Sequence, residues 1–552
     1  MTGTEQTIGT ECDMTEKAGN NVSEMPMTVI DGTGKQGAVD DTEETERMRE
    51  NFGFFGPAAF LYAIFYTFCM YRNGSGVTFP FFVAGSLLFL YLSLAKLETT
   101  LKKGSAFYMG AMVLLGISTF CTDDSRIIFF NKLGIFLLMM CLLLKQYYNT
   151  SKWGPGKFLG SICRLAFGAV GELARPFQDG AEYREENAGK TDHRVWAAGL
   201  GLLAGIPLML IVLALLASAD AVFRQMTGSL LKGITPGNMA NVIFRISFMF
   251  LAAYCLTAWL CEKRIREEVT DKRTGEPALA ITVTGMLTAL YLVFSVVQIN
   301  GLFLGRMRLP EGYTYAAYAR EGFFQLLGVS LLNFVIVLVC LRRFKDSKAL
   351  KIIMTVMSAC TFIMIASSAM RMVMYIKSYD LTFLRVLVLW ALALLAVLFI
   401  GVLINVFKAD FPWFRYSVAV VTVLYLVLSF SHPDYLIARV NVASAVENGE
   451  RQGRGIQDYD YRYLSGLCAD AAPVLVPYME NLGYELQAWA DHGATGEYSR
   501  ETHGGQWDRD SADSFGYYWM EKMDRRTEDL SLRTFNLSRY WMLRLLRQAA
   551  GK

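Results

Sequence analysis

The sequence predicts an all-α protein: a polytopic bundle of about 11 transmembrane helices with a small helical extracytoplasmic domain at its C-terminal end. The 552 residues are 53% hydrophobic and only 19% charged, whereas a soluble chain has about 25% charged residues. Residues 1–50 hold 12 Asp/Glu against 4 Lys/Arg, and residues 432–552 hold 18 against 14. The middle therefore carries a net charge of +15 and nearly all the long apolar runs. This pattern excludes a soluble enzyme, a disordered chain and a nucleic-acid binder.

Eleven apolar segments are long enough, or nearly so, to cross a bilayer. About 20 mostly apolar residues span the roughly 30 Å of hydrocarbon, and they must be helical because isolated strands leave backbone groups unpaired in lipid. The third and the eleventh segments have 16 residues each and are the shortest. In chain order the segments are Gly53–Tyr71, Val77–Ala95, Ala106–Cys121, Ile127–Leu144, Val195–Ser218, Val242–Cys261, Leu279–Ile299, Gly322–Leu341, Ala349–Met370, Val386–Phe407 and Tyr416–Ser431.

The Lys and Arg residues of the connecting loops predict the orientation of the bundle. Cytoplasmic loops carry an excess of these residues. One alternating set of loops holds 23 of them and the other set holds 10, so the richer set is placed in the cytoplasm. We therefore expect a multi-pass protein of the cell membrane with a cytoplasmic N-terminus and an extracytoplasmic C-terminus.

The polar regions complete the predicted organisation. No signal-peptide pattern precedes the first span, which is therefore expected to remain as an anchor. The N-terminal region is acidic and poor in large apolar residues, which is typical of disorder. The predicted regions are a disordered cytoplasmic tail (1–50), four spans (51–144), a cytoplasmic loop (145–194), seven spans (195–431) and an extracytoplasmic helical domain (432–552).

The cytoplasmic loop contains one predicted element, an amphipathic helix over Lys157–Phe177. Its apolar residues recur at helical spacing, and Trp153 nearby is typical of a membrane interface. One interpretation is a lipid sensor. The simpler interpretation, a helix that anchors the loop on the membrane, is favoured.

The sequence predicts no metal site and no cofactor. It has only four His, and neither C-x-x-C nor H-E-x-x-H spacing occurs. None of the 11 segments contains Asp or Glu, which counts against a proton-coupled pump. Gln298 is one of the few amides in the spans, and such groups more often bond helix to helix than line a path. The repeated halves typical of many transporters are not found.

Several motifs stand out beside the spans. Y-A-R-E-G-F-F-Q-L runs from Tyr318 to Leu326, and P-D-Y-L-I-A-R-V-N runs from Pro433 to Asn441, just after the last span. D-A-A-P occupies Asp470–Pro473, and F-N-L-S-R occupies Phe535–Arg539. Together they resemble a bacterial family of integral membrane proteins classed only as a domain of unknown function, over roughly residues 190–550. The resemblance implies the topology and no known activity.

The first motif places Tyr318, Arg320 and Glu321 where the eighth span begins. Aromatic side chains such as that of Tyr318 are typical of headgroup depth. The adjacent opposite charges of Arg320 and Glu321 either order the preceding loop or position a headgroup or a sugar. The structural role is favoured.

The second motif begins a helix, because Pro433 suits a first turn and Asp434 suits the positive helix end. Arg439 and Asn441 are expected to point into the junction between the bundle and the outer domain. Asp434 and His432 are a candidate acid and base. A coupling joint is favoured, because catalysis needs a further acid or base within reach in a pocket. The rest of the domain is predicted as helical stripes at Tyr463–Ala471 and Pro473–Met479, a polar loop at Asp491–Asp513 and a last amphipathic helix at Leu530–Leu546.

Three functions remain open. We favour a non-catalytic sensor or scaffold at the cell envelope, in contact with the bilayer and with an envelope protein bound to the outer domain. The alternatives are a transporter or channel for a small or lipid-like solute, and an enzyme acting on lipid-linked sugars. For the enzyme, Asp123 and Asp124 in an outer loop are the best carboxylate pair. Their convergence with Asp434, Arg320 and Glu321 on one cavity favours the enzyme, a central pore favours transport, and dispersal favours the scaffold.

Overall fold

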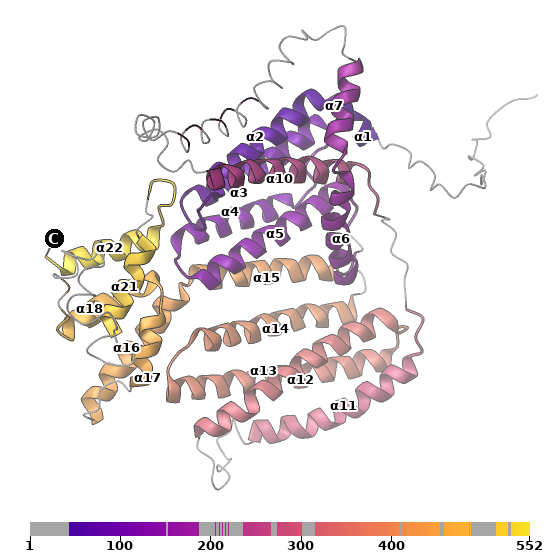
Figure 1. Cartoon of the computed structure of the whole chain (residues 1–552). Coiled ribbons are helices and arrows are strands. Elements are labelled where there is room, and N and C mark those ends of the chain that lie inside the picture. The colour runs from indigo at the N-terminus through magenta and orange to yellow at the C-terminus, as the bar shows by residue number, and fades with distance from the viewer. Residues whose placement is uncertain are drawn as a thin grey trace, which may run out of the picture. The chain divides into compact units, whose positions relative to one another are not determined.

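The computed structural model describes residues 43–150, 153–186, 236–265, 273–300, 315–408, 411–452, 458–484, 515–527 and 531–551, with a few isolated positions between them. Within these ranges the regular structure is helical, and the one strand-like pairing is an isolated bridge between Gly275 and Phe344. The all-α prediction is therefore confirmed (Figure 1). The predicted span Val195–Ser218, apart from a few isolated positions, and the predicted loop Asp491–Asp513 lie outside the described residues.

Nine of the described helices are long and apolar enough to cross a membrane, and each coincides with a predicted span. A tenth predicted span forms the shorter apolar helix α4 (Ser105–Cys121). These helices make the chain a multi-pass membrane protein. The nine are α2 (Phe52–Met70), α3 (Thr78–Lys96), α5 (Ser125–Tyr147), α10 (Pro236–Cys261), α11 (Pro277–Gln298), α12 (Tyr315–Arg343), α13 (Lys348–Tyr379), α14 (Phe383–Phe407) and α15 (Trp413–Phe430).

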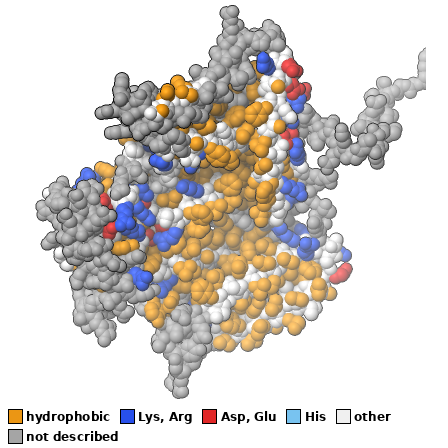
Figure 2. Space-filling model, in the orientation of Figure 1, with side chains coloured by type: hydrophobic (Ala, Val, Ile, Leu, Met, Phe, Trp, Pro, Cys, Tyr) orange, Lys and Arg blue, Asp and Glu red, His pale blue; other side chains and the backbone are white. Residues whose placement is uncertain are grey.

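The spans pack in two groups that α15 joins. Helices α2 to α5 and α10 share one buried core, in which Met112 and Leu142 are fully buried. Helices α11 to α14 form the second group, around residues such as Met357 and Phe399. Helix α15 contacts α4, α5 and α14, and Figure 1 shows it between α5 and α14. The visible outer face of the helices is broadly hydrophobic (Figure 2), as a surface in contact with lipid requires.

Short helices pack against the end of the bundle where α5 stops and α15 starts. The last eight residues of the predicted disordered tail form α1 (Glu43–Glu50), in which Met48 is buried. The helix predicted over 157–177 is divided into α6 (Pro155–Gly168), the 3-10 turn η1 (Ala169–Glu172) and α7 (Arg175–Glu186). A side chain at Gly168 would lie 2.2 Å from Nε1 of Trp259, and Pro176 suits the start of a new helix.

The region after α15 forms a small helical domain with its own core around Leu464, Met479, Trp519 and Leu546. Sequence analysis missed α21, although its buried residues Phe515, Trp519, Met520 and Met523 recur at helical spacing. The predicted last helix starts at Leu537, later than expected. The elements are α16 (Pro433–Gln452), α17 (Asp458–Gly466), η3 (Ala469–Ala471), α18 (Ala472–Asn481), α21 (Phe515–Thr527) and α22 (Leu537–Ala549).

Candidate functional site

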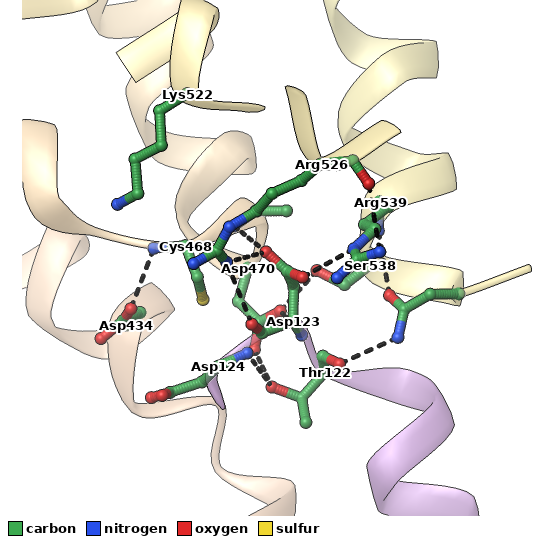
Figure 3. A network of polar contacts seen from close by, with 12 residues as sticks. Thr122, Asp123, Asp124, Asp434, Cys468, Asp470, Lys522, Arg526, Ser538 and Arg539 are labelled. Atoms are coloured by element: carbon green, nitrogen blue, oxygen red, sulfur yellow. Dashed lines mark hydrogen bonds and ion pairs between the residues drawn. The ribbon is translucent and has the colours of Figure 1, made fainter. Parts of the chain in front are cut away.

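Four buried carboxylates meet where the loop between α4 and α5 contacts the C-terminal domain (Figure 3). Asp123 and Asp124 belong to this loop, Asp434 is in the first turn of α16, and Asp470 is in η3. The first three are each 1% exposed. Carboxylates are almost never fully buried unless they are paired, so their partners define the site. We call this cluster the acidic junction; its members are Thr122, Asp123, Asp124, Arg126, His432, Asp434, Cys468, Asp470, Lys522, Arg526, Ser538 and Arg539.

Asp123 is held by two arginines from the C-terminal domain. Its Oδ2 accepts a hydrogen bond from Nη1 of Arg526 in α21, and its Oδ1 accepts one from Nε of Arg539 in α22, each at 2.7 Å. The guanidinium of Arg539 also donates to the backbone oxygen of Arg526 at 3.1 Å. One carboxylate of the membrane bundle thereby fixes two helices of the C-terminal domain.

Arg126, at the start of α5, bridges two further carboxylates. It donates from Nε and Nη2 to both oxygens of Asp124, at 2.9 and 2.8 Å, and from Nη2 to Oδ1 of Asp434 at 2.5 Å. The other oxygen of Asp434 accepts from the backbone N–H of Cys468 at 2.9 Å. The guanidinium also lies 3.8 Å from the ring centroid of Phe383, a favourable cation–π position. This bridge ties the start of α16 to the start of α5.

Asp470 is the most heavily hydrogen-bonded carboxylate of the junction. It accepts from the hydroxyl of Thr122 at 2.5 Å, from the backbone N–H of Asp123 at 2.9 Å and from the hydroxyl of Ser538. Nδ1 of His432 lies 3.0 Å from its Oδ2. Burial alone raises the pKa of a carboxyl, but the hydrogen bonds from His432, Ser538 and Thr122 outweigh it, so the pKa of Asp470 is lowered.

Two further pKa shifts, those of His432 and Asp434, follow from the same contacts. The hydrogen bond to Asp470 raises the pKa of His432, against the opposing effect of burial. His432 adopts a left-handed backbone with φ of 46°, a conformation that is uncommon for residues other than glycine. Desolvation, and then the nearby charge of Asp124, raise the pKa of Asp434, while Arg126 opposes this rise.

The charges of the junction balance. The four carboxylates face three guanidinium groups, and Lys522 supplies a fourth cation near them. All eight carboxylate oxygens accept at least one hydrogen bond. Within the described residues no group of His, Cys, Asp and Glu has an arrangement that fits a metal ion. An arrangement of this kind holds elements together.

Neutral contacts extend the junction. Asn536, fully buried at the start of α22, donates to the backbone oxygens of Thr122 at 2.9 Å and Ser75 at 3.1 Å. The backbone N–H of Val77 donates to the oxygen of Phe535 at 2.8 Å. These bonds attach the domain to the loop between α2 and α3 as well. Sequence reasoning gave Asn536 no role, although it lies in the F-N-L-S-R motif.

The motifs that carried the resemblance converge at this site. Asp470 of D-A-A-P and Arg539 of F-N-L-S-R contact the loop that contains Asp123 directly. Asp434 of P-D-Y-L-I-A-R-V-N reaches it through Arg126, and Ser538 of F-N-L-S-R through Asp470. The roles of the basic partners were missed, because nothing in the local sequence around Arg526 or Arg539 indicates which carboxylate each one meets.

The other predicted site residues lie elsewhere. Asn441 is buried and exchanges two hydrogen bonds with the backbone of Leu381, at 2.8 and 3.0 Å, which joins α16 to the loop between α13 and α14. Arg439 is exposed on α16 instead of pointing into the junction. Gln298 is buried inside the second group of spans, where it accepts from Ser367 at 2.6 Å. The side chains of Tyr318, Arg320 and Glu321 lie outside the described part of the structure.

Comparison with known proteins gives one match. The family described as Domain of unknown function (DUF4153) matches residues 109–478. The match begins earlier and ends earlier than the 190–550 expected from the motifs. It includes Asp123, Asp434 and Asp470, whereas Arg526 and Arg539 lie beyond it. No curated protein and no solved structure matches this chain.

Proposed function

This chain belongs to the DUF4153 family, and from that premise we propose that it is a non-catalytic scaffold or sensor of the bacterial cell envelope. In this proposal the membrane bundle holds the C-terminal helical domain in a fixed position through the acidic junction. The domain then presents its outer surface to an envelope protein. The charge bias of the loops supports an extracytoplasmic position for the domain and a cytoplasmic one for the N-terminus.

The observation that supports a scaffold is that every carboxylate oxygen of the acidic junction already accepts a hydrogen bond from the chain. Asp123 engages Arg526 and Arg539, and Asp434 engages Arg126 and a backbone N–H. A catalytic carboxylate needs an oxygen directed at a substrate proton. In the junction each carboxylate oxygen is already directed at a donor of the chain.

A membrane enzyme is the second candidate, and one specific observation favours it. Asp123, Asp124 and Asp434 do converge, and the half-exposed His432 is oriented by the buried Asp470. A buried carboxylate that fixes the tautomer of a histidine is a recurring part of acid–base sites. No feature of the described residues favours transport in the same way.

A graded series of variants separates the two candidates. In a host strain lacking its own copy of the chain, the phenotype restored by each variant is measured beside the docked fraction of the C-terminal domain, taken from limited proteolysis in membranes. Trp519→Ala removes a fully buried side chain of the domain core without touching a carboxylate. His432→Asn and Asp434→Asn alter the candidate acid–base groups and preserve most of their shape.

The scaffold proposal predicts that activity follows the docked fraction in all three variants. Trp519→Ala is then as damaging as any change of a carboxylate that releases the domain equally. Loss of activity in His432→Asn or Asp434→Asn with the domain fully docked would instead establish acid–base chemistry and overturn the scaffold.

A further inference from the structure

Helix α6 and the turn η1 carry two apolar faces, of which only one is covered. Phe158 and Leu165 are buried against the bundle. On another side of the same element, Leu159, Phe167 and Val170 are 63%, 78% and 60% exposed. Leu173 and Phe177 continue this exposed face toward α7. Large contiguous apolar patches on a protein surface mark contacts with partners or membranes.

The position of α6 indicates which partner covers this face. Phe158 stacks on Phe414 in the first turn of α15, with ring centroids 4.0 Å apart. Gly168 lies against Trp259, near the end of α10, and α6 also contacts α5. The helix therefore lies across the ends of three membrane-spanning helices, at the depth where hydrocarbon meets headgroups. An amphipathic helix at that depth lies in the interface with its apolar face in the acyl region.

Basic side chains surround the same end of the bundle. Lys145, at the end of α5, lies close enough to Arg415 and Lys102 to be repelled by the charge of each. Arg164 is exposed on α6 itself. Within the described residues, no ion pair involves Lys145, Arg164 or Arg415. Basic side chains at a membrane boundary attract anionic headgroups.

We propose that the apolar face of α6 and η1, together with Lys145 and Arg415, binds the anionic phospholipid surface at this end of the bundle. The acyl chains cover Leu159, Phe167 and the neighbouring apolar residues, and the lipid phosphates neutralise these two cations. On the predicted topology this is the cytoplasmic leaflet, which is the leaflet rich in anionic lipid. The inference is independent of the role proposed for the acidic junction at the other end of α5.

Cys163 provides a direct test, because it is exposed in the middle of the apolar face while most other described cysteines are buried. In a Cys12→Ser background, a spin label on Cys163 is measured by power saturation in nanodiscs of the full chain. We expect the label to be more accessible to oxygen than to a water-soluble nickel complex. The matched control carries Cys163→Ser and Arg164→Cys, which moves the label to the neighbouring charged side, where the order of the two accessibilities should reverse. Equal exposure of both labels to water would overturn the proposal.

The preference for anionic lipid has its own measurement. The association of spin-labelled phosphatidylglycerol is compared with that of spin-labelled phosphatidylcholine. Lys145→Gln and Arg415→Gln should each reduce the preference for phosphatidylglycerol by roughly fivefold, because one basic residue near an anionic surface contributes about that factor. Lys377 provides the control, because it is exposed near the end of α13, a helix that begins at Lys348. Lys377→Gln should leave the preference for phosphatidylglycerol unchanged. An unchanged preference in the first two variants, or full competition by inorganic phosphate, would contradict a phospholipid site.

Discussion

Replacing Asp123 by Asn is expected to loosen the C-terminal domain from the bundle. The carboxylate is buried between Arg526 and Arg539, and removing one partner of a buried ion pair costs about 3–5 kcal/mol. The two arginine side chains are 32% and 24% exposed, so they can turn partly toward water. We therefore expect the lower end of that range, about 3 kcal/mol, which corresponds to roughly 100-fold in the docking equilibrium.

Hydrogen exchange measured by mass spectrometry reports this change directly, because local opening controls the exchange of protected amides. Peptides from α21 and α22 should exchange roughly 100-fold faster in Asp123→Asn. Glu521→Gln is the control, because Glu521 lies in the same domain and pairs with Arg525 at i,i+4 near the surface. Such a pair contributes about 0.5 kcal/mol or less. Equal exchange in the two variants would refute the assignment of Asp123 as the main anchor.

Three further predictions address other parts of the chain. Because the pKa of His432 is raised, the protonated imidazole stabilises docking fully below about pH 6.5, and this stabilisation is lost as the pH rises through the raised pKa. Asn tolerates positive φ, so His432→Asn should fold normally and flatten the pH dependence of the melting temperature. A melting temperature that does not depend on pH in the unmodified chain would contradict this. Asn536→Ala removes the bonds to the oxygens of Thr122 and Ser75 and should cost about 2–3 kcal/mol, seen as faster proteolysis of the domain in membranes. A cytoplasm-active reporter should be silent after Lys552 and active before Thr2, whereas activity at both ends would reject the eleven-span topology.

Hydrophobic patterning predicted most of the fold, since the span boundaries depend on local apolar runs. It predicted the helix of residues 157–177 less well, because the chain there divides into α6, η1 and α7, and Gly168 at the first division lies against Trp259, about ninety residues away. It missed α21, whose buried residues Phe515 and Trp519 follow a stretch without apolar periodicity. Propensity and periodicity act within a short window, whereas these features depend on contacts between distant segments.

The candidate site was likewise predicted only in part, because its distant contacts leave no local signal. Asp123 and Asp124 were identified as a carboxylate pair in a loop, and Asp434 as the acidic residue in the first turn of a predicted helix. Their basic partners were not identified, because Arg526 lies 403 positions from Asp123. The sequence also does not distinguish an arginine that pairs with a carboxylate from the other arginines of an amphipathic helix. Arg439 was expected at the junction because it lies in the motif, yet it is exposed. We therefore expect Arg439→Ala to be milder than Asp434→Asn, the reverse of what the motif alone indicates.

The two ends of the bundle are connected by the same two helices. Helix α5 begins at the acidic junction and ends beside α6, and α15 runs in the opposite direction between the same places. Near the acidic junction, Asn131 of α5 also accepts hydrogen bonds from Tyr425 and Ser429 of α15, at 2.8 and 2.7 Å, so the two helices are joined directly as well. A movement of α6 in the lipid interface therefore has a continuous path to the C-terminal domain.

Whether such a path carries a signal depends on the junction having two discrete arrangements, because coupling requires a bistable element. The charge network favours all-or-none behaviour. Arg126 forms ion pairs with both Asp124 and Asp434, and Asp123 forms ion pairs with two arginines. Losing one of these residues from the network therefore leaves other buried charges without partners. A partly opened junction, with unpaired buried charges, is high in free energy. A fully opened junction avoids this cost because water solvates every charge. A junction that opens all at once would make the scaffold a simple two-state sensor. The pH dependence of melting and the hydrogen exchange of α21 and α22 both test whether the junction opens cooperatively.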